Sequence, residues 1–252
     1  MAGEVVSTGA RVRRFAAGDR VMALVGGGAQ ATLATVDETN ALPLPAGVPW
    51  PEAGGFPQVF ATAHDALFTQ GRLTIGERVL VSGAAGGVGT AAVQLAAVAG
   101  ARVVAEVRDA ALRDAVAGLG AGEVIEAAEV TRRRPYDLIL ELVGGPSLAA
   151  ALPCLATGGR AVVIGVGAGA TLEVDLHLLM SRRAQVRAST LRARSLAQKT
   201  GVVAALESAV LPLLAAGRVR VPVAASFPLD RVAAAYQRFA GGGKLGKIVL
   251  VT

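Results

Sequence analysis

One stretch, residues 77–108, constrains the fold of this chain more than any other. It opens with the apolar run 79–81, passes through a glycine-rich turn, continues as an Ala/Val/Leu helix, and ends in a second β-branched run at residues 103–104. Strand, turn, helix and strand in this order form one unit of a parallel sheet. A turn this rich in glycine lets backbone N–H groups approach a pyrophosphate, and the positive end of the helix dipole then faces the phosphates. The expected ligand is therefore a dinucleotide.

The turn departs from the common dinucleotide-binding signature at one position. It reads Ala84-x-Gly86-x-x-Gly89, with alanine where the first glycine of G-x-G-x-x-G usually stands, so the turn must accommodate one Cβ. A lone signature of this kind is weak evidence, but here a strand precedes it, a helix follows it, and a second strand comes at the right distance. The alternative is a glycine turn that only packs a strand against a helix.

The amino-acid composition indicates a globular protein and argues against a nucleic-acid-binding one. The 252 residues are 53% apolar, which is enough to build a substantial core. Lys and Arg number 25 against 19 acids, but only three of the 25 are lysines, and the arginines are scattered apart from residues 132–134. This pattern does not favour a polyanion-binding protein. An RNA- or anion-binding role through residues 132–134 and 182–194 is kept as a separate hypothesis.

Cysteine and histidine are too scarce for the usual zinc sites. Cys154 is the single cysteine, which excludes an internal disulfide, and His64 and His177 are the two histidines. These three side chains do not supply the ligand sets of structural or catalytic zinc, so no metal is expected. We expect no signal peptide before the first strand, and Gly, Arg or Asp interrupts every apolar stretch before it reaches membrane-spanning length. The prediction is a soluble protein of a reducing, cytoplasmic compartment.

The rest of the chain predicts a small β unit followed by an alternating α/β domain. Residues 4–36 read as short strands and glycine turns, with residues 29–36 as the last of these strands. Prolines punctuate a connector over residues 43–57, and helical spacing begins at Phe60. From there to about residue 195, six β runs alternate with helices, which predicts a doubly wound parallel sheet with right-handed crossovers. A long helix over residues 196–216 opens the last segment, in which strands and one further helix follow.

Several segments taken in order resemble a known family. They are GEVVSTGARVRRFAAGDRVMALVGGG near the start, SGAAGGVGTAAVQLA at the turn, STLRARSLAQK at residues 189–199, and then LLAAGRVR, FPLDRVAAAYQRF and GGKLGKIVLVT. Nearly end to end, the chain resembles the medium-chain dehydrogenase/reductases, and among them the zinc-free quinone oxidoreductases of the zeta-crystallin type. The resemblance implies a partial GroES-like β domain over residues 1–60, a Rossmann domain over 61–195, and a segment over 196–252 that returns to the first domain.

The resemblance also implies an activity and a set of cofactor-binding residues. The activity is hydride transfer from NADPH to a quinone or an activated alkene, such as an enone or enoyl group, without a metal. No catalytic acid is named, because the reduced oxygens of a quinone can take protons from water. The implied cofactor-binding residues are Thr62, Ala85, Gly86, Gly87, Val88, Arg108, Val143, Gly144, Ile164, Gly165 and Val166.

The end of the second strand favours NADPH over NADH. In NADH-binding proteins, an acidic residue at the end of this strand binds the ribose hydroxyls. In this chain the residue that aligns with that position in the family is Val107, flanked by Glu106 and Arg108. Valine cannot accept hydrogen bonds from the ribose, whereas Arg108 can form charge-assisted bonds to a 2′-phosphate. Where relatives often place a phosphate-binding lysine, this chain has Leu112, next to Arg113. Glu106 would repel a phosphate if it pointed inward.

Two departures from the family suggest an alternative function. Relatives begin with further β strands that line the substrate side of the cleft, whereas the likeness here starts at Met1, so we expect one wall of the active site to be missing. The segment 126–136 is also shorter than in relatives. The alternative is a non-catalytic NADPH-binding protein, a truncated pseudo-enzyme that acts as a sensor or partner. The expected partners are a small-molecule substrate and a second copy of the chain, paired as a homodimer through an edge strand at residues 185–190.

Overall fold

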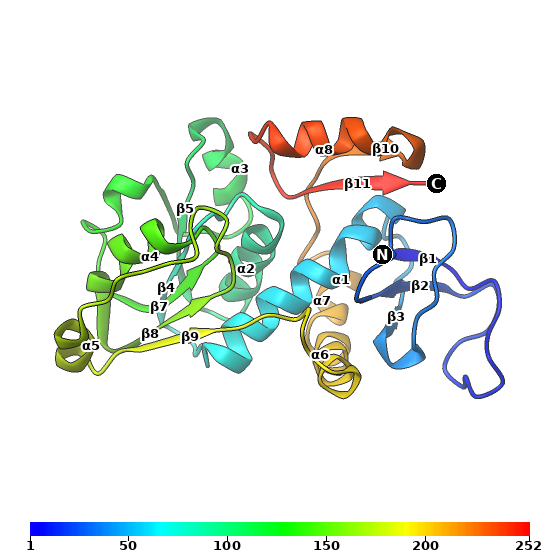
Figure 1. Cartoon of the computed structure of the whole chain (residues 1–252), viewed down its shortest axis with the longest axis horizontal. Coiled ribbons are helices and arrows are strands. Elements are labelled where there is room, and N and C mark those ends of the chain that lie inside the picture. Colours follow the sequence, from blue (N-terminus) through cyan, green and yellow to red (C-terminus); the bar gives the residue numbers. More distant parts are fainter. The chain divides into compact units, whose positions relative to one another are not determined.

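A six-stranded parallel sheet organises residues Thr62–Thr190 in the computed structural model, which describes all of residues 1–252 (Figure 1). The strand order is β6-β5-β4-β7-β8-β9. The strands are β4 (Arg78–Val81), β5 (Arg102–Glu106), β6 (Glu123–Ile125), β7 (Tyr136–Glu141), β8 (Leu155–Val163) and β9 (Gln185–Ala188). Because β4 pairs with both β5 and β7, the chain winds outward from β4 in two directions, which makes the carboxyl end of β4 the topological switch point. The predicted doubly wound α/β sheet is confirmed, and β9 lies at its edge.

Helices cover both faces of this sheet. Helix α2 (Gly87–Val98) lies on one side, and α4 (Gly145–Ala151) and α5 (Leu176–Arg182) lie on the other, while the short α3 (Arg113–Ala117) packs near β6 (Figure 1). On the α4 face, Leu80, Val104 and Ile139 from three adjacent strands form one buried cluster with residues of α4. Since both faces are covered, the central strands β4, β5 and β7 carry consecutive buried apolar residues. This is why the sequence shows continuous apolar runs here and not a strict alternation.

The other unit comprises Met1–Ala61 and Leu191–Thr252. Its two sheets are an antiparallel one in the order β1-β2-β3 and a parallel pair formed by β10 and β11. The strands are β1 (Ala2–Glu4), β2 (Arg20–Ala23), β3 (Ala41–Pro43), β10 (Val223–Pro228) and β11 (Lys247–Val251). The helices are α1 (Trp50–His64), α6 (Leu196–Ala209), α7 (Leu211–Ala215) and α8 (Val232–Ala240). The last three residues of α1 belong to the sheet unit. None of the helices in the chain combines the length and apolar character that crossing a bilayer requires.

Three sequence expectations for this unit are wrong. Residues 29–36 form no strand, because residues 26–35 are all exposed and have no apolar face to bury; Leu33 itself is 70% exposed. The third strand comes later, as β3. Helix α1 starts at Trp50, inside the expected proline connector, since Pro51 lies in the first turn, where a missing N–H costs nothing. The long helix predicted over residues 196–216 is divided at Val210, and Pro212 then occupies the first turn of α7.

Candidate dinucleotide-binding site

The glycine turn joins β4 to α2 at the carboxyl edge of the sheet. Gly83 has φ +60°, and the N–H of Ala84 donates to the carbonyl of Glu106 at 3.0 Å, which ties the turn to the end of β5. Gly86 is the N-cap of the twelve-residue helix α2 and has no side chain with which to cap it. The first N–H groups of any α-helix lack partners inside the helix. Here they are left for a ligand, and the helix dipole favours an anionic one.

Close backbone packing explains two positions of the signature. A Cβ at Gly89 would lie 2.4 Å from the carbonyl oxygen of Gly83 and 2.6 Å from Cα of Ala84, so only glycine lets α2 approach the turn this closely. At the first position, where the signature usually has glycine, the structure accommodates Ala84 by burying it completely. The turn therefore tolerates its one extra methyl group without opening.

Glu141, at the end of β7, holds three segments of this edge together. Its side chain is fully buried, and Oε1 accepts hydrogen bonds from Ser82 Oγ at 2.8 Å and from the N–H groups of Val143 and Gly144 at 2.6 and 2.9 Å. Its main-chain carbonyl accepts from the N–H groups of the two residues that follow β8, Ile164 and Gly165, at 2.9 and 3.1 Å. One residue thus fixes the loops after β4, β7 and β8. Its second carboxylate oxygen, Oε2, is buried without a hydrogen-bond partner.

The structure brings most of the sequence-predicted residues together at this edge. They are Ala85, Gly86, Gly87 and Val88 in the turn, Val143 and Gly144 after β7, and Ile164, Gly165 and Val166 after β8. A Cβ on Gly83 would lie 3.2 Å from the side chain of Val143, so the turn and the loop after β7 are neighbours. The N–H groups of Val143 and Gly144 already donate to Glu141, so these two residues can meet a ligand only through their other atoms.

The two remaining predicted residues lie in different surroundings. Thr62 lies in the last turn of α1 and is only 8% exposed, so most of its side chain is covered. Arg108 follows β5, is exposed, and its guanidinium makes no hydrogen bond or ion pair within the chain. Between β5 and Arg108, the side chain of Val107 is buried, at 1% exposed. Arg108 is therefore a free cation at the tip of the second strand.

Glu106 belongs to a polar row at the carboxyl ends of three adjacent strands. The strand registers pair Val81 with Ala105 and with Leu140, which puts the next residues, Glu106, Ser82 and Glu141, side by side on β5, β4 and β7. Burial, and then the negative charge of Glu141, raise the pKa of the Glu106 carboxyl above its ordinary value. Glu106 is therefore protonated more easily than an exposed glutamate. A neutral Glu106 would not repel a bound phosphate.

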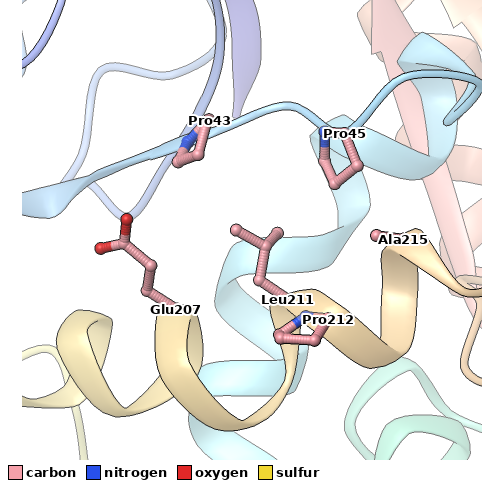
Figure 2. Close-up of a pocket in the computed structure, with 6 residues that line it drawn as sticks. All are labelled: Pro43, Pro45, Glu207, Leu211, Pro212 and Ala215. Atoms are coloured by element: carbon pink, nitrogen blue, oxygen red, sulfur yellow. The ribbon is translucent and has the colours of Figure 1, made fainter.

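A hollow in the other unit has a different character. It measures about 260 Å³ and is lined by Pro43, Pro45, Glu207, Leu211, Pro212 and Ala215 (Figure 2). Its only charged group, the Glu207 carboxylate, accepts from the Arg14 guanidinium at 2.8 Å through both oxygens. The walls thus offer no free polar group to orient a ligand, whereas the glycine turn offers several N–H donors.

Comparison with known proteins agrees with this geometry, which is that of a Rossmann-type dinucleotide-binding domain. The family model of the zinc-binding dehydrogenases matches residues 107–250. The quinone oxidoreductase of Thermus thermophilus, whose structures include a complex with NADPH, is 36% identical over 93% of this chain and 77% of its own, with a TM-score of 0.84. The CurK enoyl reductase is 25% identical over 99% of this chain and 77% of its own, with a TM-score of 0.83.

A third similarity is to part of a much larger protein. Highly-reducing polyketide synthase 1 of Aureobasidium melanogenum is 31% identical over 99% of this chain, and this chain spans only 12% of that synthase. Together, the matched family model and the shared fold show that the chain belongs to the medium-chain dehydrogenase/reductases, in their quinone oxidoreductase-like branch. The resemblance found in the sequence is confirmed.

The residues present do not fit the zinc that the name of the family model implies. With one cysteine and two histidines in the chain, no three His, Cys, Asp or Glu side chains come together in a group that could hold a metal ion. Cys154 is buried in the apolar cluster under α4, and its thiol lies 3.7 Å from the carbonyl of Ala150. Zinc sites in proteins are built from three or four such ligands.

Sequence reasoning missed Glu141 as a positioning group for this site. The available signal was an acid at the end of the strongly apolar run Tyr136–Glu141, since a carboxylate is rarely placed there unless it is hydrogen-bonded. Ser82, directly after β4, is its partner and was missed for the same reason.

Replacing Gly89 by alanine should destabilise the chain, because the new Cβ would collide with backbone atoms of residues 83 and 84, which cannot move aside as a flexible side chain can. We expect a loss of roughly 1–3 kcal/mol in the free energy of unfolding, measured by denaturant titration. Gly167→Ala is the matched control, since a Cβ there meets nothing within 4 Å. Equal stability of the two variants would contradict the close packing of the turn on α2.

Replacing Glu106 by glutamine should change how stability depends on pH. Because the pKa of Glu106 is raised in the folded chain, its favourable contribution is complete below its unfolded pKa and is lost as pH rises through the folded value. The neutral glutamine does not show this loss. The melting temperature of Glu106→Gln relative to the wild type should therefore increase from about pH 4 towards neutrality, by calorimetry. A constant difference across this range would refute the coupling.

Proposed function

We propose that this chain is an NADPH-dependent oxidoreductase that transfers a hydride to a quinone or an activated alkene. The observation that carries the proposal is the uncapped N-terminus of α2 at the switch point of the sheet, with the free cation Arg108 at the tip of β5. Dinucleotides bind at this place in open α/β sheets, and the pyrophosphate meets the helix N-terminus.

Different residues at the carboxyl edge of the sheet would bind different parts of the cofactor. The turn at residues 85–88 would bind the pyrophosphate through its free N–H groups, which exclude that of Gly86 because it donates to the carbonyl of Gly83 at 3.0 Å. Arg108 would bind the 2′-phosphate of the adenosine ribose. Glu141 keeps the loops after β7 and β8 in place, so that Ile164, Gly165 and Val166 form a fixed apolar surface for the nicotinamide ring. The bound cofactor supplies the hydride; the protein supplies binding and orientation.

Two substrate classes fit this proposal. A quinone is favoured by the similarity to the Thermus thermophilus quinone oxidoreductase, and it requires no acid from the protein, since its reduced oxygens can take protons from water. An enoyl group is favoured by the similarity to CurK enoyl reductase and to a segment of a polyketide synthase. Hydride addition to an enoyl group leaves a carbanion-like centre, so that reaction also needs a proton donor.

The alternative is a protein that binds NADPH without catalysis. The same turn and the same arginine would then serve a sensing or assembly role, and no acceptor would be reduced. The distinction is kinetic, because both hypotheses predict cofactor binding.

Steady-state oxidation of NADPH with a panel of quinones, enones and enoyl thioesters tests the proposal. We expect turnover with at least one class, and Gly86→Val should abolish it, because a valine at this N-cap keeps ordinary backbone angles (φ −72°, ψ 170°) but fills the cradle. Gly27→Val, at an exposed position outside the sheet unit where an added Cβ meets nothing within 4 Å, is the control. NADPH binding without turnover on any acceptor would support the non-catalytic alternative, and the lack of both binding and turnover would overturn the proposed function.

A further inference from the structure

The parallel pair of strands β10 and β11 has one edge at which backbone groups are left without partners. Strand β11 pairs with β10 alone, and in such a ladder alternate residues bond to the neighbouring strand. The N–H of Lys247 donates to the carbonyl of Pro222 at 2.8 Å, which fixes the alternation. The N–H and C=O groups of Ile248 and Leu250 therefore point away from β10, and no backbone hydrogen bond within the chain reaches them.

Side chains nevertheless cover β11 on both of its faces. On one face lies α1, where a Cβ built on Gly54 would be 3.7 Å from Cγ1 of Val249, and one built on Gly55 would be 3.4 Å from Cγ of Lys247. On the other face, α8 packs against both β10 and β11 (Figure 1). Residues 247–250 are half-buried, and the run 248–251 is apolar throughout. These are the surroundings and the sequence of an interior strand of a parallel sheet, yet β11 lies at an edge.

The opposite edge of the pair differs in composition. By the same alternation, Ser226 and Pro228 are the residues of β10 whose backbone faces away from β11, and both are exposed. Proline has no N–H to offer, and proteins commonly protect a solvent-exposed edge strand with such residues. After Lys247, β11 contains neither a proline nor a charged residue. Of the two edges, the one formed by β11 is therefore suited to receive another strand.

Positive charge gathers where β11 begins. Burial, and then the charges of Lys247 and Arg238, lower the pKa of Lys244, and burial lowers the pKa of Lys247. The amino group of Met1 belongs to the same cluster, since burial and then the charge of Lys247 lower its pKa to about 6. None of the ion pairs of the chain involves these groups. An acidic side chain that arrived here would therefore meet half-buried cations without counter-charges.

We propose that β11 binds an extended, acidic segment of another polypeptide as an added strand. The backbone of that segment would bond to the N–H and C=O groups of Ile248 and Leu250, and an acidic side chain would lie opposite Lys247. A second copy of β11 is a poorer complement, because residues 247–251 include a lysine and no acid. The inference is independent of the dinucleotide site, since all of these residues belong to the other unit of the chain.

Binding of labelled peptides to the full chain, followed by fluorescence anisotropy, tests the proposal. The probe is a nine-residue peptide of alternating valine and threonine with a glutamate at each end, so that either strand direction brings a carboxylate to Lys247. The control peptide has lysines in place of the glutamates. We expect the glutamate peptide to bind at least about tenfold more tightly than the lysine peptide. Lys247→Glu should reverse this preference, and Lys199→Gln, which removes a lysine of α6, should leave it unchanged.

Hydrogen–deuterium exchange separates strand addition from attraction between charges alone. When the glutamate peptide binds, the amides of Ile248 and Leu250 should become protected, and the outward amide of Ser226 should exchange as before. Peptide binding without protection of Ile248 and Leu250 would overturn the proposal, as would the absence of binding. Protection of these two amides that grows with protein concentration in the free chain would show that a second copy covers the edge, and it would also overturn the proposal.

Discussion

The buried carboxylate of Glu141 is the interaction on which the geometry of this site depends. A fully buried carboxylate is costly unless hydrogen bonds replace its lost water. Three donors converge on one oxygen of Glu141, and they come from the end of β4 and from the loop after β7. The main-chain carbonyl of the same residue then fixes the loop after β8. The carboxyl ends of three central strands are therefore set by one residue, and the glycine turn is built against that fixed edge.

Charge is distributed unevenly along this edge. Two acids, Glu106 and Glu141, lie in the polar row at the ends of the central strands. Glu141 is hydrogen-bonded through one oxygen, and burial, followed by the charge of Glu141, raises the pKa of Glu106. The positive groups are the uncapped N-terminus of α2 and the exposed Arg108. An anion that reaches the turn therefore meets the N-terminus of α2, while the carboxylate of Glu141 is fully buried. A dinucleotide with two or three phosphates suits this order of charges.

The sequence was sufficient for the architecture of the sheet unit. Apolar runs at regular intervals, separated by helical patterns, predict parallel strands, and the glycines of the turn predict the close approach that Gly89 makes to Gly83. It was less informative where local signals conflict. The prolines over residues 43–57 suggested a connector, yet Pro51 and Pro57 lie within α1, and the β-branched residues of 29–36 find no partner strand.

Most residues of the candidate site could be predicted from the sequence, but the hydrogen bonds that each of them makes could not. The role of Glu141 depends on tertiary placement. It needs Ser82, which follows the neighbouring strand β4. Likewise, Val143 and Gly144 were predicted as cofactor contacts, but only the structure shows that their N–H groups are already occupied. The spacing of residues along the chain does not predict such contacts.

Hydrogen–deuterium exchange of the backbone amides, with and without NADPH, tests the central claim most directly. If the N-terminus of α2 holds the pyrophosphate, the amides of residues 87–89 in its first turn should become strongly protected in the wild type and stay unprotected in Gly86→Val. Protection elsewhere in the chain, with unchanged exchange at residues 87–89, would contradict the account.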